Sequence, residues 1–294
     1  VVMRQFEPLE WLTLAQDHQV NRAMLVPTML KMVMDHPRFH EFDLASLNVI
    51  TYGAAPMPID VIRQAINEFP GARFINAFGQ TETGSTIATV PPEDHVLEGP
   101  SELVAKHRKH LASIGKPLPD VEVRVVDGDG ADVGVETTGE IVARGPRLMS
   151  GYWKDGQATR DAFYGDWLLT GDLGYRDEDG YIYYEARMDD MINTGGYNVS
   201  GLDVESVLIE HPKVRECAVV GSPDKLRGQI VKAFIVSDRS GDDAFMREVQ
   251  DFTSQRLARH EYPRAVAFVD ALPKTPAGKI NRQILRDAQT DGDI

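Results

Sequence analysis

The residues with the clearest chemical potential form one stretch, residues 77–84, with the sequence Ala-Phe-Gly-Gln-Thr-Glu-Thr-Gly. Its two glycines let a backbone approach a ligand closely. Its threonine hydroxyls and N–H groups can hold phosphate oxygens, and its carboxylate can hold a hard cation such as Mg²⁺. Phe78, just before the first glycine, offers a flat face for a nucleobase. The pattern is typical of a nucleotide site, and an ordinary polar turn explains this stretch equally well when it is taken alone.

Three later stretches carry groups suited to the same chemistry. Asp172 ends the run Thr-Gly-Asp and could accept two sugar hydroxyls, or it could cap a turn. Arg187 opens a polar segment whose Gly195-Gly196 pair could pass close to a ligand or form an ordinary hairpin turn. Lys279 follows Pro-Ala-Gly in a proline-containing loop near the C-terminus. It could be a catalytic cation or a solvated lysine.

The hydrophobic pattern predicts the elements that must position these residues. In residues 1–112, strands 23–26, 47–51 and 73–76 alternate with helical stretches, which predicts an α/β layer with a mostly parallel sheet. Residues 113–188 alternate polar and apolar side chains between turns, which predicts antiparallel hairpins in a small barrel or sandwich. The order of predicted helices and strands in residues 189–294 indicates a compact α+β domain. In it, Ser200 and Asp203 are expected to form a helix-capping pair.

Composition narrows the classes of partner. The chain has 294 residues, 42% of them hydrophobic, and a net charge of −14 without a run of Lys or Arg. This balance argues against nucleic acid and anionic membranes as main partners. No apolar run is long enough to span a bilayer, and the single Cys217 fits a buried residue in a reducing cytoplasm. Because the chain opens on Val1 rather than Met, we expect a fragment of a longer protein.

These stretches, in this order and with Gly115-Lys116-Pro117 and Gly151-Tyr152-Trp153 between them, resemble the adenylate-forming superfamily. That superfamily includes acyl-CoA synthetases, luciferases and peptide-synthetase adenylation domains. The resemblance covers the whole chain as roughly the C-terminal half of such an enzyme. It implies that residues 1–188 are a truncated large AMP-binding domain and that residues 189–294 are a small mobile α+β domain. The implied chemistry is ATP-dependent activation of a carboxylate to an acyl-AMP, then thioester formation with CoA.

The resemblance also implies roles for individual residues. Thr81 would bond the α-phosphate, Glu82 would hold Mg²⁺, Asp172 would bind the ribose, and Arg187 would contact the ribose and phosphate side of the nucleotide. Lys279 would stabilise the charge that builds up during adenylation. The implied nucleotide- and CoA-binding set comprises Gly53, Ala54, Ala55, Asn76, Ala77, Phe78, Gly79, Gln80, Thr81, Asp172, Arg187, Gly195, Gly196 and Tyr197.

The family pattern further implies a two-pose cycle. The small domain would rotate about Asp189, first delivering Lys279 for adenylation and then presenting Gly195, Gly196 and Tyr197 to the pantetheine arm of CoA. The acyl pocket would be lined by residues 52–56 and by residues near 80–83. Residues 190–201 and 228–233 most resemble ligases for aromatic acids, such as benzoate and 2-aminobenzoate, and medium-chain acyl-CoA synthetases. No charged residue lies between Tyr52 and Ala55, which fits an apolar or aromatic acid better than an amino acid.

One family feature is missing. No glycine-rich loop ending in Lys, which would cradle the β- and γ-phosphates, occurs in the sequence. We therefore expect that this chain alone does not complete adenylation. The alternatives are a catalytically inactive remnant that binds only AMP or CoA, and a binding module for a partner chain. The sequence leaves the acid and the oligomeric state open.

Overall fold

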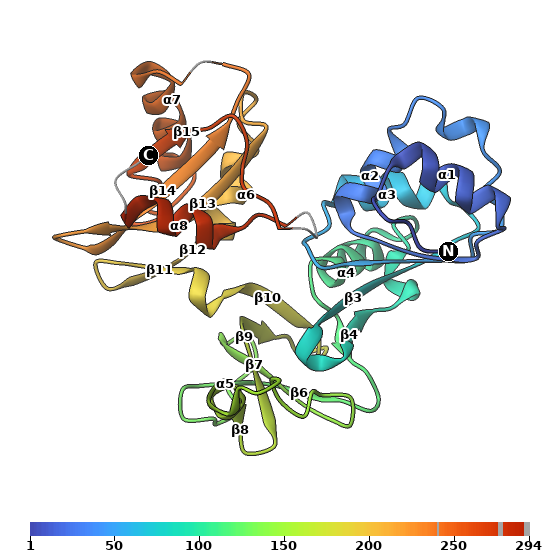
Figure 1. Ribbon diagram of the computed structural model, residues 1–294, viewed down its shortest axis with the longest axis horizontal. Helices are drawn as coiled ribbons and strands as arrows, with labels where there is room; N and C mark the ends of the chain where they lie inside the picture. Colours follow the sequence, from blue (N-terminus) through green and yellow to red (C-terminus); the bar gives the residue numbers. More distant parts are fainter. Residues whose placement is uncertain (240, 276–278, 291–294) are drawn as a thin grey trace. The chain divides into compact units, whose positions relative to one another are not determined.

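The computed structural model describes residues 1–239, 241–275 and 279–290 of the chain (Figure 1). They form two compact units. The first comprises Val1–Thr170 and Gly174–Tyr184, and the second comprises Gly171–Leu173 and Glu185–Ile294. No helix among the described residues is both long enough and apolar enough to cross a membrane.

The first unit begins with a five-stranded sheet in the order β1-β2-β3-β4-β5. Strands β1, β2 and β3 run parallel, whereas β4 and β5 are added antiparallel. The sheet is therefore mixed, and the expectation of a mostly parallel sheet holds only for its first three strands. Its elements are α1 (Pro8–Asp17), β1 (Arg22–Leu25), α2 (Pro27–Met34), η1 (Phe39–Glu41), β2 (Val49–Gly53), α3 (Ile59–Glu68), β3 (Arg73–Gln80), η2 (Thr81–Thr83), β4 (Ser85–Val90), η3 (Pro92–His95), α4 (Ser101–Leu111) and β5 (Lys116–Pro117).

Burial explains why these residues form these elements. Helices α1, α2 and α3 contribute Leu12, Leu30 and Ile62 to a core that also contains Ile50 and Phe74 from the strands. All five side chains are at most 2% exposed. Burying each of them contributes about 1.5–3 kcal/mol, so this core fixes the sheet on which the polar residues are carried.

A second sheet is ordered β10-β9-β7-β6, with β8 paired to β9. It belongs to the first unit except for residues 171–173 of β9 and 185–187 of β10, which belong to the second. Strands β6 and β7 form the antiparallel pair expected from the alternating sequence. β10 also pairs outside this sheet, through an antiparallel bridge between Ile182 and Gly115, and the expected barrel or sandwich stays a prediction. Its elements are β6 (Glu122–Val126), β7 (Gly139–Arg144), α5 (Gly156–Asp161), β8 (Phe163–Tyr164), β9 (Trp167–Arg176) and β10 (Ile182–Arg187).

The second unit has its own sheet, ordered β12-β11-β14-β13, with β15 paired parallel to β14. Ser200 caps helix α6 by accepting a hydrogen bond from the Asp203 N–H, as the sequence predicts. Cys217 is 7% exposed, and burial raises the pKa of its thiol to about 12. The elements are η4 (Met188–Asp190), β11 (Met191–Thr194), β12 (Tyr197–Ser200), α6 (Gly201–Leu208), β13 (Glu216–Asp224), β14 (Gly228–Val236), α7 (Asp243–Ser254), β15 (Ala265–Phe268) and α8 (Arg282–Thr290).

Candidate active site

In the turn that follows β3, Thr81 is exposed and Thr83 is buried. The Thr83 hydroxyl oxygen accepts from the Gln80 N–H at 2.9 Å and donates to the Ser85 carbonyl at 2.7 Å. Thr83 is fully buried, whereas Thr81 is exposed. The idea that both threonine hydroxyls can hold phosphate oxygens is therefore wrong for Thr83, because its hydroxyl closes the turn. Thr81 is exposed, so its hydroxyl is available to a ligand.

Glu82 is held in place from a distant part of the sequence. The Tyr152 hydroxyl donates to Glu82 Oε1 at 3.0 Å, and the Met149 N–H donates to the Glu82 carbonyl at 2.8 Å. Among the described residues, none donates a hydrogen bond to Glu82 Oε2. One carboxylate oxygen is thus fixed by a neutral donor while the other can accept a cation. This arrangement fits a Mg²⁺ ligand, since Mg²⁺ is commonly bound through one or two carboxylates.

Strand β3 continues to Gln80, further than expected, and carries the predicted adenine-binding residues. Asn76 Nδ2 donates to the Ser113 carbonyl at 3.2 Å, so its Oδ1 remains an acceptor that suits an exocyclic amine. Phe78 is half-buried, and its ring lies 6.4 Å from the ring of Tyr184. The ring therefore packs partly against the β subdomain, and its stacking on adenine remains a prediction.

At two positions in the predicted site, only glycine fits, because the backbone of a neighbouring strand leaves no room for a side chain. A Cβ on Gly79 would lie 1.7 Å from the Ser85 carbonyl oxygen, where the β3–β4 pairing has a bulge. A Cβ on Gly53 would lie 2.1 Å from the Ala77 carbonyl oxygen on the paired strand β3. The structural reason for both glycines is close approach of two strands. Close approach to a ligand is not needed to explain them.

The carboxyl end of β2 presents small exposed residues, as predicted, but Tyr52 does not belong to that surface. Ala54 and Ala55 are exposed, and Ala54 has a left-handed φ of 66°. Such strained residues cluster at functional sites. Tyr52 is 0% exposed, and its hydroxyl lies 2.9 Å from His95 Nε2. Its expected place in the wall of an acyl pocket is therefore wrong, because its ring belongs to the core.

A hydrogen bond joins the β3 turn to β9. Gln80 Nε2 donates to the Thr170 carbonyl at 3.2 Å, although the two residues are 90 positions apart in the chain. Thr170 is buried and its own hydroxyl donates to the Ile141 carbonyl at 2.5 Å. This hydrogen bond fixes the predicted phosphate-binding turn against the first part of β9 within the first unit.

In the second unit, Asp172 and Arg187 form an ion pair. Arg187 Nη1 lies 2.9 Å from Asp172 Oδ1, and Asp172 is 5% exposed. Gly171, with φ 69°, gives the guanidinium room: a Cβ there would lie 3.2 Å from Arg187 Nη2. The structure therefore brings together two residues that we predicted separately as ribose and phosphate contacts. Their roles toward a nucleotide remain predictions.

The Gly195-Gly196 pair forms the tight turn between β11 and β12. Both glycines have left-handed φ, 61° and 87°, and the Gly195 N–H donates to the Arg227 carbonyl at 2.9 Å. The hairpin-turn interpretation is thus confirmed, and the CoA role stays a prediction. Next to the turn, the exposed ring of Tyr197 stacks on His260 with centroids 4.4 Å apart.

Lys279 is exposed on a loop whose base is pinned. The Thr275 N–H donates to the Lys279 carbonyl at 2.7 Å, and the Lys279 N–H donates to Thr275 Oγ1 at 3.2 Å. Among the described residues, the Lys279 ammonium forms no ion pair. Pro276, Ala277 and Gly278, which belong to the same predicted motif, lie outside the described residues.

The predicted hinge is a single turn of 3-10 helix, η4, which contains Asp189. Arg286 of helix α8 donates to the Asp189 carbonyl at 3.4 Å and forms an ion pair with Asp190 at 2.5 Å. These contacts tie the turn to α8 within the second unit. Rotation about Asp189 remains a prediction.

Comparison with known proteins identifies the chain. Residues 1–153 match the family described as AMP-binding enzyme, and residues 203–279 match the AMP-binding enzyme C-terminal domain. The chain belongs to the AMP-binding enzyme family. Its α/β fold and its resemblance to the adenylate-forming superfamily are thereby confirmed.

Several proteins similar to this chain are ligases or synthetases. This chain is 36% identical over 292 residues to the medium/long-chain-fatty-acid–CoA ligase FadD8 of Mycobacterium tuberculosis. The aligned region covers 97% of this chain and 49% of FadD8. The structure of amide bond synthetase McbA from Marinactinospora thermotolerans matches with a TM-score of 0.82 at 34% identity, over 97% of this chain and 55% of that one. The o-succinylbenzoate CoA synthetase MenE from Bacillus subtilis, solved with its acyl-adenylate intermediate, matches with a TM-score of 0.81 at 31% identity. This match covers 97% of this chain and 55% of the MenE chain, so the chain spans about half the length of such relatives.

Sequence reasoning missed the role of Tyr152 in this AMP-binding enzyme. The motif Gly151-Tyr152-Trp153 contributed to the family resemblance, but nothing in it pointed to Glu82, which lies 70 positions earlier. The sequence carries no signal for this contact, because it depends on how the two segments fold together.

Proposed function

We propose that this chain forms part of an ATP-dependent carboxylic acid–CoA ligase that works through an acyl-AMP intermediate. The observation that carries the proposal is the turn at Glu82. It exposes the Thr81 hydroxyl and leaves one Glu82 oxygen without a partner among the described residues, while Tyr152 fixes the other. Membership of the AMP-binding enzyme family supports the same chemistry.

Each of the candidate site residues would have its own role in the adenylation step. Joining a carboxylate to a phosphate brings two anions together, so positive charge is needed. Mg²⁺, when bound, supplies part of that charge, and Glu82 would hold it while Thr81 donates to the α-phosphate. Asp172, oriented by Arg187, would accept from the ribose hydroxyls. The exposed ammonium of Lys279 would neutralise charge on the attacking carboxylate and the phosphate.

The second half-reaction would use a different surface of the second unit. Gly195 and Gly196 leave the tip of the β11–β12 turn without side chains, and Tyr197 is exposed beside them. A narrow thiol arm such as the pantetheine of CoA would pass such a surface easily. We propose rotation about Asp189 as the switch between the two steps.

For the substrate, we propose an aromatic or medium-chain acid. The exposed residues after β2 are Ala54, Ala55 and Pro56, which offer no charge to pair with an amino group. Relatives act on acids of both kinds, including a medium- and long-chain fatty acid ligase and the o-succinylbenzoate synthetase.

Pyrophosphate exchange tests the function. The 294-residue chain alone should give no acid-dependent exchange of pyrophosphate into ATP, because its sequence contains no glycine-rich loop for the β- and γ-phosphates. Joined to the upstream half that its relatives contain, it should exchange pyrophosphate with a panel of aromatic and medium-chain acids. Exchange by the chain alone would contradict the first expectation. If the completed protein binds AMP without any exchange, the chain is an inactive remnant.

Tyr152→Phe tests the proposed metal ligand. Removing the hydroxyl frees Glu82 Oε1, so we expect the apparent affinity for Mg²⁺ in the exchange assay to fall about tenfold, as for other residues that orient metal ligands. Tyr164→Phe is the matched control, since Tyr164 is 63% exposed and lies in β8, where it pairs with Trp167 of β9. An unchanged Mg²⁺ dependence in Tyr152→Phe would contradict the role of this contact.

A further inference from the structure

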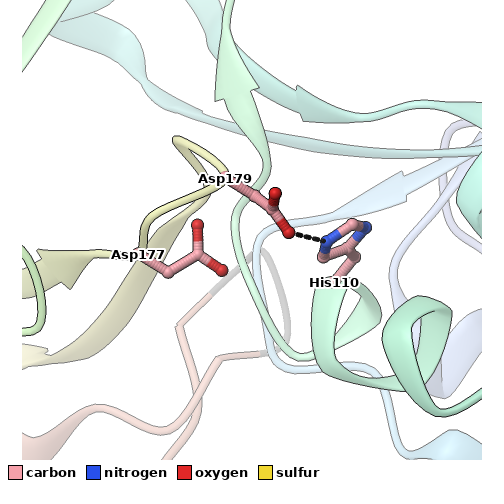
Figure 2. A group of neighbouring side chains, drawn as sticks. All are labelled: His110, Asp177 and Asp179. Atoms are coloured by element: carbon pink, nitrogen blue, oxygen red, sulfur yellow. Dashed lines mark ion pairs between the residues drawn. The ribbon is translucent and has the colours of Figure 1, made fainter. Parts of the chain in front are cut away.

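A second group of potential metal ligands lies in the first unit, apart from Glu82. His110 comes from helix α4, while Asp177 and Asp179 come from the turn between β9 and β10. Their ligand atoms all lie within 4.8 Å of one another. Figure 2 shows the three side chains turned toward a common space, with the ion pair between His110 and Asp179 marked.

The imidazole of His110 is fixed in position by its neighbours. Its Nδ1 lies 2.9 Å from Asp94 Oδ1, and the Tyr181 hydroxyl donates to the other Asp94 oxygen at 2.5 Å. The rings of His110 and Tyr181 stack with centroids 3.7 Å apart. A carboxylate on Nδ1 selects the tautomer that carries its proton there, which leaves a lone pair on Nε2. Histidines that bind metals are commonly oriented in this way.

The Nε2 atom has no satisfactory partner within the protein. His110 is only 3% exposed, and Nε2 forms no hydrogen bond with residues 1–239, 241–275 or 279–290. The nearest acid is Asp179, whose Oδ2 lies 3.6 Å away, too far for a hydrogen bond. Buried polar atoms without partners are rare and costly, and an unplaced ion is one explanation for them. A metal ion would give this nitrogen a partner and draw the two carboxylates to it.

Charge in the network also favours a cation. Four carboxylates (Asp94, Asp177, Asp179 and Glu136) face two ammonium groups (Lys106 and Lys109). With a neutral imidazole the network therefore has excess negative charge. Lys106 lies 3.0 Å from Asp179, and Lys109 lies 3.3 Å from Asp177. Both lysine side chains are about half exposed, so each can turn into solvent at little cost. Asp177 then still accepts from the Tyr181 N–H at 2.9 Å and from the Tyr183 hydroxyl at 3.1 Å, and each oxygen keeps a lone pair for a cation.

We propose that His110, Asp177 and Asp179 bind a divalent metal ion of the zinc class. One imidazole and two carboxylates suit such a metal, whereas Mg²⁺ and Ca²⁺ prefer oxygen ligands alone. The ion would join the C-terminal end of α4 to the β9–β10 turn and so stabilise the first unit. The site is independent of the proposed ligase function, because none of its residues belongs to the Glu82 turn.

Zinc binding by the whole chain is the direct test. The protein is stripped with a chelator, dialysed against ZnCl₂ and measured by elemental analysis, with a melting curve recorded in parallel. We expect one tightly held equivalent of zinc and a higher melting temperature, since a ligand that binds the folded state stabilises it. MgCl₂ at the same concentration should produce neither change. Zinc retained at no more than background level would overturn the proposal.

Two variants test whether the zinc ion binds at these three residues. Asp179→Asn removes one ligand from a half-exposed side chain and should weaken zinc binding by at least about tenfold, because even outer-shell partners cost ~10–100-fold. Lys106→Ala removes the competing ammonium and should tighten binding roughly two- to fivefold. Asp129→Asn, at an exposed turn, is the control and should leave binding unchanged. If Asp179→Asn binds zinc as well as Asp129→Asn does, the ion lies elsewhere and the proposed site is wrong.

Discussion

Lys279→Ala should abolish adenylation while leaving thioester formation intact. In the enzyme completed by the upstream half that its relatives contain, we expect acid-dependent pyrophosphate exchange to fall by about 10²–10³-fold, the usual effect of losing one group that stabilises developing charge. Thioester formation from supplied acyl-AMP should proceed near its normal rate. The result depends on the proposed ligase function and on its two-pose cycle.

We expect this effect because the backbone of Lys279 is fixed while its ammonium group is exposed. Thr275 forms hydrogen bonds with both the N–H and the carbonyl of Lys279, so the position of the Lys279 Cα is defined. The side chain is exposed and has no acidic partner among the described residues, so its charge is available to a ligand. A lysine in this setting can contribute to one step and be withdrawn for the next.

Lys274→Ala is the matched control for this prediction. Lys274 belongs to the same loop, but its ammonium lies 2.7 Å from Glu216, in a surface ion pair that contributes at most about 1 kcal/mol. Its removal should leave both half-reactions unchanged. Equal loss of the two half-reactions in Lys279→Ala would contradict the two-pose assignment. Loss in both lysine variants would point to damage to the loop.

What could be predicted from the sequence depended on local patterns. The capping of α6 by Ser200 involves residues within a few positions of each other, so their spacing was sufficient. The Gly195-Gly196 hairpin turn was one of two alternatives that the sequence left open. The buried Cys217 followed from its apolar neighbours. In the same way, the individual pieces of the candidate site could be recognised as short motifs.

Contacts between distant segments could not be predicted. The Tyr152–Glu82 bond spans 70 positions and the Gln80–Thr170 bond spans 90, and no periodic pattern connects such residues. For residues 113–188 the sequence predicted only antiparallel hairpins, because the proximity of Asp177 to His110 depends on how α4 packs. The mixed sheet was missed for a related reason: β4 follows a tight turn, and turn geometry, rather than hydrophobic pattern, reverses its direction.

Gly79→Ala should destabilise the first unit severely, even though the change adds a single methyl group. The new Cβ would lie 1.7 Å from the Ser85 carbonyl oxygen and 3.0 Å from the Thr86 Cα. Both contacts are with backbone, so no side-chain rotation can relieve them, and β3 and β4 must separate at the bulge. We expect a loss of at least about 3 kcal/mol in the free energy of unfolding, at the upper end for overpacking.

Gly71→Ala provides the comparison, because the same methyl group there meets no atom within 4 Å. Its stability should be unchanged or slightly higher, by less than about 1 kcal/mol. The three tryptophans, Trp11, Trp153 and Trp167, all belong to the first unit, so urea unfolding followed by tryptophan fluorescence reports on that unit alone. The midpoint for Gly79→Ala should fall by roughly 1 M urea or more relative to Gly71→Ala. Equal midpoints would mean that β4 does not lie against Gly79, and the turn that presents Thr81 and Glu82 would then lack the support described for it.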